Sequence, residues 1–490
     1  METLSKHSGI LQGRIRRQNE KPDSFPRSHP RFAVPLFTGC QGGTEPADNH
    51  SKNNNPVNSN SDAPQPEPDY SWFTMPEETS KLTVYSNEDN LKSVLAPAIR
   101  LFREKYPEVE VDYQIYGQDE YDSVIRTELP AGRGSDLVLL DSVTIKDVYK
   151  TMGTGLFENL DPYFAKDDVI TLDDYVSGVM DGGLFRGERL VVPLAYSLPI
   201  YMTTRSLLDE LGVSAESLST CEGFTEAAKR YHEHYPDGSL YLDENYLDPL
   251  SPTMRKLYYA WNPGFIDYEK MEITAEEDQI KQYADLLKLY YIPDYKVNDK
   301  AKANRRSTLY TFQDSYLLKE CLYNDGCRGF SFYMNARSLV PKEYGIFAFI
   351  PPNLNGGRTA SIELMAVLPK ASQNKLNAWR LLKILLSDDI QSGTDDSVGN
   401  LRYFWSGEPV KKGSIRKVLD SKRARGDYLC PTEMFDDYCA LWEDVTEAVY
   451  MPIVLQEHIR DELYPYVRGE RSWEDCWKRF VNTLELYKDE

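Results

Sequence analysis

Two carboxylates of the sequence stand where a charged side chain is costly. Glu363 lies inside the apolar run SIELMAVLP, and Asp141 directly follows the apolar residues of DLVLL. A buried carboxylate is stable only when it accepts hydrogen bonds or pairs with a cation. Glu363 is therefore an acceptor for ligand hydroxyl groups, a partner in a salt bridge, or a residue on a solvent-facing side of its strand. Asp141 either accepts from a ligand or caps a helix that begins at Ser142.

The sequence contains no recognisable catalytic or metal-binding motif. H-E-x-x-H, G-x-S-x-G and G-x-x-x-x-G-K-[ST] are all absent, and none of the seven cysteines stands in a C-x-x-C pair. The triplet HEH at 232–234 is too short for two metal ligands on one helix face, so we interpret it as a solvated helix end. We expect no catalytic residue, no metal and no cofactor.

Composition narrows the class of protein further. The chain has 490 residues, of which 41% are hydrophobic, enough for two or three domains with sizeable cores. Its net charge of -21 disfavours binding to nucleic acid. It contains 34 tyrosines, whose rings offer a flat apolar face and a hydroxyl group suited to binding grooves. No apolar run approaches the ~20 residues of a membrane-spanning helix.

The first eighty residues predict an anchor and a tether. A short apolar stretch, residues 32–37, leads to LFTGC, which resembles a bacterial lipobox with Cys40 as the lipidated residue. The apolar stretch contains Pro35 and is shorter than the ~7–15 residues of a normal signal, so the segment is degenerate. Residues 41–71 are rich in Asn, Ser, Pro and Asp and cannot bury enough surface to fold. Alternatively, FTGC is a chance match in a disordered tail.

From residue 81 onward, strand and helix patterns alternate. The strand patterns are KLTVYS (81–86), VEVDYQIY (109–116) and DLVLL (136–140), and the helix patterns cover 87–108 and 119–129. This order predicts an α/β lobe with a mainly parallel sheet. Because ligands of such sheets bind beyond the carboxyl ends of the strands, Ser86, Asn87, Asp141 and Ser142 are expected at the edge of a cleft.

Several segments, in their order along the chain, resemble the bacterial extracellular solute-binding proteins of ABC importers. The resemblance is to the sugar-binding group that includes the maltodextrin-binding proteins, and it spans residues 81–490. The matching segments are FREKYP with EVEVDY after it, GRGSDLVLLD, GLFENLDPYF (155–164), VVPLAYSLPIYMTTRSLLDELGV, the stretch 341–391, and YVRGERSWEDCWKRFVNTLELY. Residues 240–330 match the family poorly, and we expect the identity of the ligand to depend on them.

The resemblance implies an α/β fold of the type 2 periplasmic-binding-protein class, with two lobes joined by crossing hinge strands. The expected divisions are a degenerate signal and lipobox at 1–40, a disordered linker at 41–79, an N-terminal lobe at 80–194 plus 364–408, and a C-terminal lobe at 195–363 plus 409–490. The chain would cross between the lobes near 193–200, near 357–365 and near Pro409. A ligand would bind between the lobes and be buried by hinge closure, which requires no catalytic group.

The ligand implied by this resemblance is a sugar or an oligosaccharide, delivered to the permease subunits of an ABC transporter. Aromatic faces bind sugar rings, and carboxylates, amides or arginine bind their hydroxyl groups. The residues predicted to do so are Tyr85, Asp141, Tyr196, Trp261, Asn262, Tyr333, Arg337 and Glu363. For Tyr196 a purely structural role is an equal alternative, and for Trp261 it is the favoured one.

Other functions stay open at this point. With 77 acidic residues, a glycosidase pair of carboxylates is easily available, so a glycan-active enzyme is the main alternative. A surface adhesin is a third possibility, and a peptide or a polyamine is another ligand for a binding protein. We expect a monomer held on the extracellular face of a bacterial membrane by the lipid on Cys40. Cys321 and Cys327 form a disulfide or stay as buried thiols.

Overall fold

The computed structural model describes residues 69–87, 94–142, 144–235, 239–241, 257–290, 321–323, 330–393, 407–427 and 430–489. Contacts divide the chain into two units, Met1–Trp72 and Phe73–Glu490. All helices and strands given below lie in the second unit. The predicted lipidation site Cys40 and the predicted linker up to residue 68 lie outside the described residues. Within the described part, no helix combines the length and the apolar character needed to cross a membrane.

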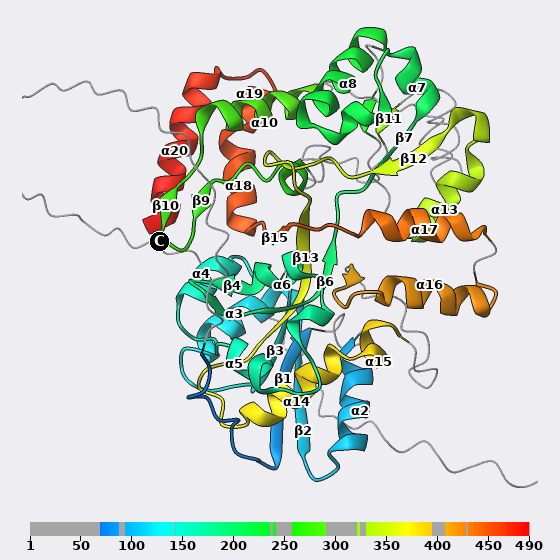
Figure 1. Cartoon of the computed structure of the whole chain (residues 1–490). Coiled ribbons are helices and arrows are strands. Elements are labelled where there is room, and N and C mark those ends of the chain that lie inside the picture. Colours follow the sequence, from blue (N-terminus) through cyan, green and yellow to red (C-terminus); the bar gives the residue numbers. More distant parts are fainter. Residues whose placement is uncertain are drawn as a thin grey trace, which may run out of the picture. The chain divides into compact units, whose positions relative to one another are not determined.

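A seven-stranded sheet forms the centre of the first lobe (Figure 1). Its strands are β1 (Lys81–Asn87), β2 (Glu110–Tyr116), β3 (Leu137–Asp141), β6 (Val192–Ser197), β13 (Thr359–Val367), β14 (Glu408–Pro409) and β15 (Glu447–Val449). The order is β14-β6-β13-β3-β1-β2, and β15 pairs with β13 outside this path. The sheet is mixed and not mainly parallel as predicted, because β13 runs antiparallel to both β3 and β6.

Helices cover this sheet and bury a continuous core with it. They are α2 (Ala96–Lys105), α3 (Gln118–Glu128), α4 (Val148–Gly153), α5 (Asp161–Lys166), α6 (Ser177–Met180), α14 (Lys375–Leu385) and α15 (Asp388–Gln391), with 3-10 turns η2 (Leu172–Asp174) and η3 (Asp181–Gly183). A short hairpin, β4 (Leu184–Phe185) with β5 (Glu188–Arg189), precedes β6. The strands and helices predicted between residues 81 and 141 are all present, because their apolar faces are the ones that this core buries.

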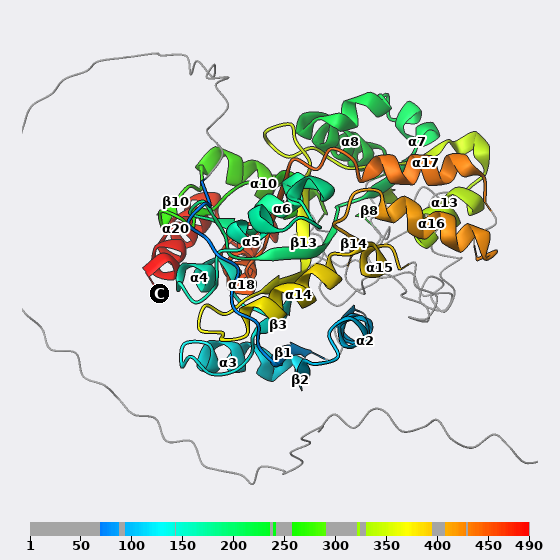
Figure 2. The ribbon, with the colours of Figure 1, turned by 60° about the horizontal axis from the view of Figure 1, so that its bottom comes forward.

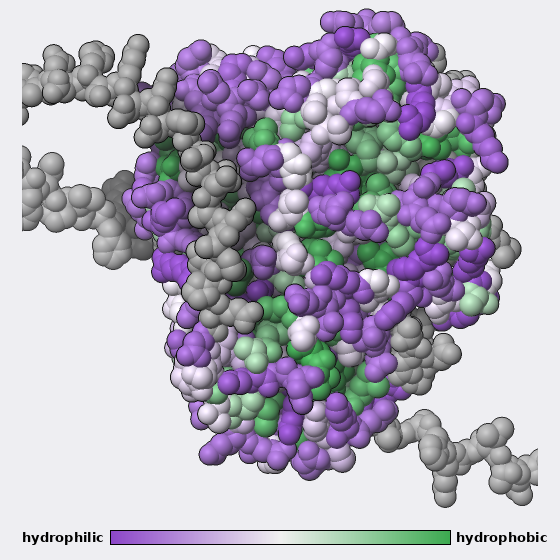
Figure 3. All heavy atoms as spheres, viewed as in Figure 1, coloured by the Kyte–Doolittle hydropathy of each residue, from purple (hydrophilic) through white to green (hydrophobic). Residues whose placement is uncertain are grey.

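The second lobe has a core of its own, made mostly by helices. They are α7 (Arg205–Glu210), α8 (Cys221–His234), α10 (Glu277–Tyr290), α18 (Ile453–Glu462), α19 (Tyr464–Val467) and α20 (Trp473–Asp489), with 3-10 turns η4 (Ala215–Ser219) and η5 (Lys342–Tyr344). Its strand pairs are β7 (Tyr201–Thr204) with β12 (Ile346–Phe349), β8 (Ser239–Tyr241) with β11 (Cys321–Tyr323), and β9 (Ile266–Asp267) with β10 (Glu272–Ile273). On the face shown in Figure 3, hydrophobic residues form several separate patches among hydrophilic ones.

Three further helices extend the first core. They are α13 (Phe330–Leu339), α16 (Ser414–Ala424) and α17 (Thr432–Leu441). Phe330 of α13 stacks on Phe435 of α17, with ring centroids 4.8 Å apart, and both rings belong to the first core. Figures 1 and 2 both show α16 and α17 side by side. Of these helices, α16 contacts β14, the edge strand next to β6, and packs against α17.

The chain passes between the lobes at three places near the middle of the sheet. Residues 198–200 join β6 to β7, residues 350–358 join β12 to β13, and residues 450–452 join β15 to α18. The first passage lies in its predicted range, 193–200, whereas the second overlaps its predicted range, 357–365, only at its last two residues, because β13 already begins at Thr359. Pro409, predicted at the third, lies in β14 and pairs with β6 inside the sheet. All nine residues of β13 are buried, so this strand ties the passages to the first core.

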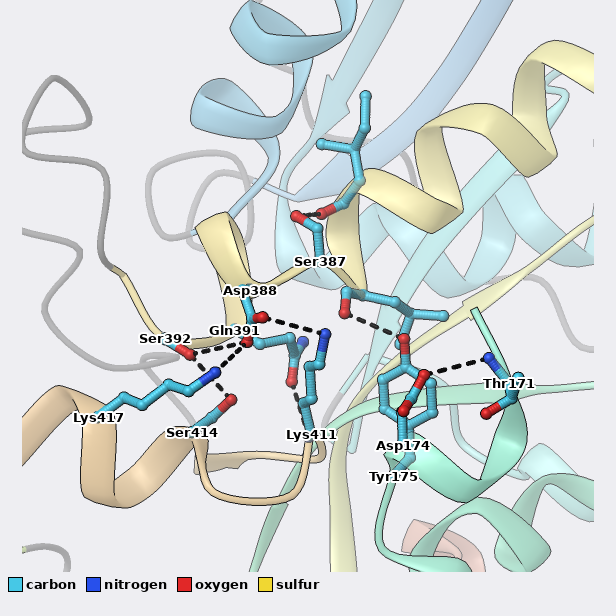
Figure 4. Close-up of polar contacts among 12 residues, drawn as sticks. Thr171, Asp174, Tyr175, Ser387, Asp388, Gln391, Ser392, Lys411, Ser414 and Lys417 are labelled. Atoms are coloured by element: carbon cyan, nitrogen blue, oxygen red, sulfur yellow. Dashed lines mark hydrogen bonds and ion pairs between the residues drawn. The ribbon is translucent and has the colours of Figure 1, made fainter. Parts of the chain in front are cut away.

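A buried polar junction fastens β14 and α16 to the rest of the first lobe (Figure 4). The side-chain amide of Gln391 donates to the carbonyls of Leu194 and Leu385, at 3.3 and 3.0 Å. Its carbonyl oxygen accepts from the backbone N–H of Lys411 at 3.2 Å. Beside it, Asp388 pairs with Lys417 at 2.8 Å, and this hydrogen bond lowers the pKa of the Asp388 carboxyl. One side chain thus serves three backbone groups, two of them fully buried.

Replacing Gln391 with methionine is expected to destabilise the protein while preserving side-chain volume. Gln391→Met leaves the three backbone groups without these partners, and one unsatisfied buried polar group costs about 1–3 kcal/mol. We expect the free energy of unfolding, measured with urea, to fall by about 2–4 kcal/mol. The exposed Gln373, which donates to Ala371 at 3.0 Å, provides the control Gln373→Met, expected within about 0.5 kcal/mol of the parent protein. Equal unfolding midpoints for the two variants would contradict this assignment.

Candidate functional site

Polar side chains gather at the carboxyl ends of β1 and β3. The amide of Asn87 donates to Asp141 at 2.5 Å and to the hydroxyl of Thr144 at 3.3 Å. The Thr144 hydroxyl also donates to Asp141, whose side chain is buried. Asp141 therefore holds together the loop that follows β3, and no helix begins at Ser142. We call Asn87, Asp141, Ser142, Thr144 and Glu363 the strand-end cluster.

Glu363 connects three neighbouring strands of the sheet. Its carboxylate accepts from the hydroxyl of Ser142, after β3, at 2.8 Å and from that of Ser197, at the end of β6, at 2.5 Å. The backbone carbonyl of Glu363 accepts from the N–H of Ser142 at 3.1 Å. Its side chain is 8% exposed. The carboxylate thus acts as a hydroxyl acceptor between β3, β13 and β6, with serines of the chain as donors.

Tyr85 lies on β1, and its side chain reaches α3. Its hydroxyl donates to Glu128 at 2.6 Å, and its ring meets that of Tyr116 edge-on at 5.2 Å. Burial and this carboxylate raise the pKa of the Tyr85 hydroxyl. Ser86 points to the opposite face of the strand, whereas Asn87 shares the face of Tyr85, since successive side chains alternate. Tyr85 and Asp141 both interact electrostatically with Tyr121, but their hydrogen-bond partners differ: Tyr85 binds Glu128, and Asp141 binds Asn87 and Thr144.

Three other predicted residues meet at an aromatic cluster beside β6. The ring of Tyr196 contacts Trp442 at 5.3 Å, Trp442 contacts Tyr438 at 5.9 Å, and Tyr438 contacts Tyr333 at 5.6 Å. Arg337 donates to the Tyr333 hydroxyl at 2.8 Å and pairs with Asp437 of α17 at 2.5 Å. The rings belong to the first core, so here these residues join α13 and α17 to a crossing strand.

A buried glutamate completes this cluster. Glu408 of β14 lies opposite Tyr196 in the sheet and accepts from the Tyr438 hydroxyl at 2.8 Å. Burial raises the pKa of the Glu408 carboxyl to about 7, and the hydrogen bond from Tyr438 only partly opposes this shift. Removal from water also raises the pKa of Tyr196. The electrostatic environment of the crossing strand therefore depends on the protonation of Glu408.

The two lobes meet at α4, which follows the strand-end cluster along the chain. Tyr149 of α4 stacks on Tyr268 of the second lobe, with ring centroids 4.4 Å apart and planes 15° apart. On the first-lobe side, Tyr450 belongs to the first core, and its N–H donates to the Tyr149 hydroxyl at 3.1 Å, which holds that ring in place. The N–H of Ile453 donates to the carbonyl of Lys146 at 2.9 Å. We call these contacts the α4 junction.

A cavity of about 200 Å³ lies on one side of the α4 junction. We call it the aromatic cavity; it is lined by Tyr149, Leu184, Phe185, Tyr258, Asn262, Gly264, Phe265, Ile266, Tyr268, Glu269, Val449 and Leu455. Asn262 is the predicted binding residue among them. The neighbouring Trp261 packs in the second core instead, and its indole N–H has no hydrogen-bond partner in the described part of the chain.

Two polar groups of the aromatic cavity are available to a ligand. The Tyr258 hydroxyl and the Asn262 side-chain amide form no hydrogen bond with any described residue, although the Tyr258 side chain is only 6% exposed. Burial raises the pKa of the Tyr258 hydroxyl, which keeps it a neutral donor and acceptor. A few polar groups among aromatic walls are typical of a site that binds a small uncharged molecule.

Backbone strain is present at the aromatic cavity. Among described residues, four non-glycine residues have positive φ: Asn262 (44°) lines the cavity, Arg186 (52°) follows its wall residue Phe185, and Met271 (55°) and Asp444 (60°) lie outside the wall. Arg186 follows Phe185 of the cavity wall and binds Glu269, its N–H lying 2.7 Å from the carboxylate. Strained backbone of this kind persists where the surrounding structure enforces it, commonly at ligand sites.

A second and larger cavity, of about 370 Å³, lies on the other side of α4. We call it the polar cavity; it is lined by Asp122, Ile125, Arg126, Leu129, Pro130, Lys146, Asp147, Lys150, Thr151, Thr154, Leu156, Val454 and Tyr487. Asp122 pairs with Arg126 at 2.7 Å on the rim of α3. The described residues include no group of His, Cys, Asp and Glu that could hold a metal ion.

Of the residues that line the aromatic cavity or the polar cavity, only Asn262 was predicted from the sequence. Tyr149 and Lys146 follow the carboxyl end of β3, and this position was a usable signal. Tyr258, Tyr268 and Tyr487 carried none, because 34 tyrosines offer no local pattern that separates them.

Comparison with known proteins agrees with this geometry. Residues 85–238 match the model of a family described as bacterial extracellular solute-binding protein. One solved structure with this fold is MalE, the sugar-binding protein of Xanthomonas citri, with 17% identity, a TM-score of 0.57 and coverage of 83% of this chain and 96% of that chain. A second is a cyclic alpha-maltosyl-1,6-maltose binding protein from Arthrobacter globiformis, with 13% identity, a TM-score of 0.55 and coverage of 84% and 99%. A third is an ABC transporter solute binding protein from Thermotoga lettingae bound with alpha-D-tagatose, with 16% identity, a TM-score of 0.50 and coverage of 84% and 100%. No curated protein matches in sequence.

These matches confirm the resemblance predicted from the sequence, over residues 85–238 for the family and over most of the chain for the fold. At 13–17% identity, the solved structures establish the two-lobed α/β fold alone.

Glu408 makes stability depend on pH in a defined direction. The carboxyl titrates near 4.5 in the unfolded chain and near 7 in the folded protein. Between these values the folded state holds a proton that the unfolded state has lost, so stability falls as pH rises through this window. Glu408→Gln keeps the oxygen that accepts from Tyr438 and removes the buried charge. We expect it to raise the free energy of unfolding by about 1–3 kcal/mol at pH 8.

At pH 5 the parent Glu408 is protonated in the folded state, so the gain from Glu408→Gln should largely vanish there. Urea denaturation at both pH values checks this, with Glu433→Gln, an exposed site on α17, as the control without pH dependence. An equal effect of Glu408→Gln at pH 5 and pH 8 would rule out this titration.

Proposed function

We propose that this chain is the solute-binding component of an ABC importer, which captures a sugar between its two lobes and presents it to the permease subunits. The observation that carries this proposal is that both cavities at the α4 junction take their walls from both lobes. In the aromatic cavity, Tyr149 comes from the first lobe and Tyr258 from the second. In the polar cavity, Asp122 comes from the first lobe and Val454 from the second. A ligand in this space contacts both lobes at once.

The chemistry of the walls supports a sugar as the ligand. Tyrosine and phenylalanine rings offer flat apolar faces, and the Tyr258 hydroxyl and the Asn262 amide offer uncharged donors and acceptors. The polar cavity adds charged hydrogen-bonding groups, and its volume falls within the ~300–1,000 Å³ of ligand pockets. Sugars are also the molecules named for the relatives from Arthrobacter globiformis and Thermotoga lettingae. A polyamine is less well supported, since Glu269, the carboxylate of the aromatic cavity, already accepts from Arg186.

Hinge closure is the mechanism that this proposal requires. The lobes are joined by three passages beside β13, and the strand-end cluster ties β3, β13 and β6 together where these passages begin. A ligand that contacts both lobes stabilises the closed arrangement by its differential affinity for it. The predicted lobe boundaries, 80–194 plus 364–408 and 195–363 plus 409–490, do not follow the two cores, because α13, all of β13 and the elements from β14 to β15 pack with the first lobe. We propose instead that the second lobe runs from β7 to β12, apart from α13, and resumes at α18. Candidates to be tested beside Asn262 are Tyr85, Asp141, Tyr196, Trp261, Tyr333, Arg337 and Glu363.

The cellular setting is part of the same proposal. Lipidation of Cys40 would hold the protein on the extracellular face of a bacterial membrane, with the polar segment that follows as a tether, and the protein would act as a monomer. A lipid-anchored, non-enzymatic carrier is supported by the lipobox-like LFTGC and by the family match over residues 85–238. Labelling of cells with a palmitate analogue, compared with a Cys40→Ala variant, tests the anchor.

A thermal-shift screen tests the ligand class. D-tagatose, maltose, maltotriose and cyclic glucans form the sugar set, with spermidine and a tetrapeptide pool as the other classes. A ligand at 100 times its Kd stabilises the folded state by about 2.7 kcal/mol, so we expect a sugar to raise Tm by several degrees. Stabilisation by spermidine or peptides alone contradicts the sugar assignment. Release of product from chromogenic glycosides favours the glycan-active enzyme.

Asn262 is expected to contribute to ligand affinity without contributing to folding. Asn262→Gly removes the amide from the aromatic cavity, and glycine accepts the positive φ of 44° without strain. We expect an unchanged or higher Tm and a 5- to 30-fold higher Kd for the sugar found in the screen, the effect of one or two hydrogen bonds. Met271→Gly relieves a similar φ of 55° outside the cavity wall and should leave Kd unchanged. Equal Kd values for the two variants would remove Asn262 from the site.

A further inference from the structure

The last turn of the chain contacts the first lobe across the α4 junction. Tyr487 of α20 donates a hydrogen bond to the carboxylate of Asp147, and the Lys150 ammonium donates to the Tyr487 carbonyl. The same ammonium lies 3.9 Å from the centroid of the Tyr487 ring. Tyr487 is 2% exposed and belongs to the second core, whereas the apolar residues of α4 belong to the first. These contacts therefore join the two lobes.

The partner of Tyr487 has a fixed position in the first lobe. Asp147 caps α4, and its side chain accepts from the N–H of Lys150 at 3.0 Å. Burial raises the pKa of the Asp147 carboxyl, so this group depends on its hydrogen bonds for its stability in the ionised form. A hydroxyl from the other lobe that reaches this carboxylate is therefore bound at a rigid, already oriented acceptor.

Tyr487 also acts on the wall of the aromatic cavity. Its hydroxyl lies 3.2 Å from the hydroxyl of Tyr268, and Tyr268 stacks on Tyr149. Tyr149 and Tyr268 line the aromatic cavity, whereas Asp147, Lys150 and Tyr487 line the polar one. One side chain near the end of the chain thus stands between both cavities and positions the facing tyrosines of one of them.

We propose that Tyr487 is a latch that holds the two lobes together before ligand arrives and positions Tyr268 against Tyr149. Its hydroxyl serves Asp147 in one lobe and Tyr268 in the other, so opening the lobes separates it from the carboxylate. The functional importance of the latch rests on the proposed function, because the latch would control how readily a solute reaches the cavities. The contacts are made by residues of the chain itself, so the test needs no ligand.

Hydrogen exchange followed by mass spectrometry reads the latch directly. The backbone amide of Ile453, at the start of α18 in the second lobe, donates to the carbonyl of Lys146 in the first lobe, so it is protected only while the lobes are together. In Tyr487→Phe, which keeps the ring and removes the hydroxyl, we expect this amide to exchange about tenfold faster, the effect of one hydrogen bond to a charged group. X-ray scattering of the same ligand-free variant should show a larger radius of gyration.

Tyr466→Phe is the matched control. The Tyr466 hydroxyl donates to the carboxylate of Asp285 at 2.5 Å, and both residues lie in the second lobe, so this variant loses the same type of bond without affecting the junction. Its exchange at Ile453 should equal that of the parent protein. Parent-like exchange and parent-like scattering for Tyr487→Phe would overturn the latch.

Tyr487→Phe could speed exchange simply by destabilising the whole second lobe. The variant Asp147→Asn separates that effect from the loss of the latch. Asparagine keeps an oxygen that accepts from the N–H of Lys150, so α4 stays capped, but it removes the carboxylate that Tyr487 binds. Faster exchange confined to Ile453 in this variant supports the latch. If exchange is also faster throughout α10 in both variants, Tyr487 is a structural residue of the second core, and the latch proposal is overturned. Since no sugar is added, a failed ligand screen leaves this result intact.

Discussion

The structure depends on how a carboxylate inside its longest strand obtains hydrogen bonds. Glu363 is buried in β13, where an unpartnered charge would cost more than the protein could tolerate. Ser142 and Ser197 supply the two donors, and they come from the ends of β3 and β6, the strands on either side. The requirement therefore fixes the relative position of three strand ends. One passage between the lobes begins at the end of β6 and another ends at the start of β13, so the alignment of these strands also fixes where the hinge segments start.

The two lobes meet through contacts of different character on either side of α4. Toward the aromatic cavity the contact is a stack of tyrosine rings, which tolerates small sliding because stacking is weakly directional. Toward the polar cavity it is made by hydrogen bonds to Asp147 and from Lys150, which depend steeply on distance and angle. Because the polar contacts are either made or lost, this junction favours two arrangements of the lobes, one with the contacts and one without them, over a continuous range of intermediate positions.

The sequence allowed the first lobe to be predicted in detail up to residue 141 and the rest only through its resemblance to a family. β1, β2, β3 and α3 carry local periodic patterns, so their faces could be assigned one residue at a time. The mixed direction of the sheet could not, because β13 pairs with strands about 170 and 230 residues earlier in the chain, and no local pattern records such pairing. The passage after β6 followed from the family pattern, whereas the range predicted for the second passage is mostly β13 itself, and Pro409 lies inside the sheet.

The types of residue in the sequence indicated the region of the candidate site more accurately than the individual residues that form it. Glu363 and Asp141 were singled out because charges are costly in or after apolar runs, and both proved to be hubs of hydrogen bonds. Tyr196, Tyr333 and Arg337 do meet, but at a cluster that joins helices to β6. The tyrosines at the α4 junction were missed because their importance comes from contacts between distant segments. Asn262 was included for its amide, and its positive φ was not visible in the sequence.

The place of β13 in the sheet has a consequence for the synthesis of the protein. β3 and β6 are neighbours of β13, and residues 359–367 reach the ribosomal exit long after residue 141 has left it. At about 5–20 residues per second, the edge of β3 waits roughly 10–40 s for its partner. During that time the apolar strand LVLLD is exposed to other nascent chains. A chaperone that shields this segment, or export before folding, would suit a chain whose middle strand arrives so late.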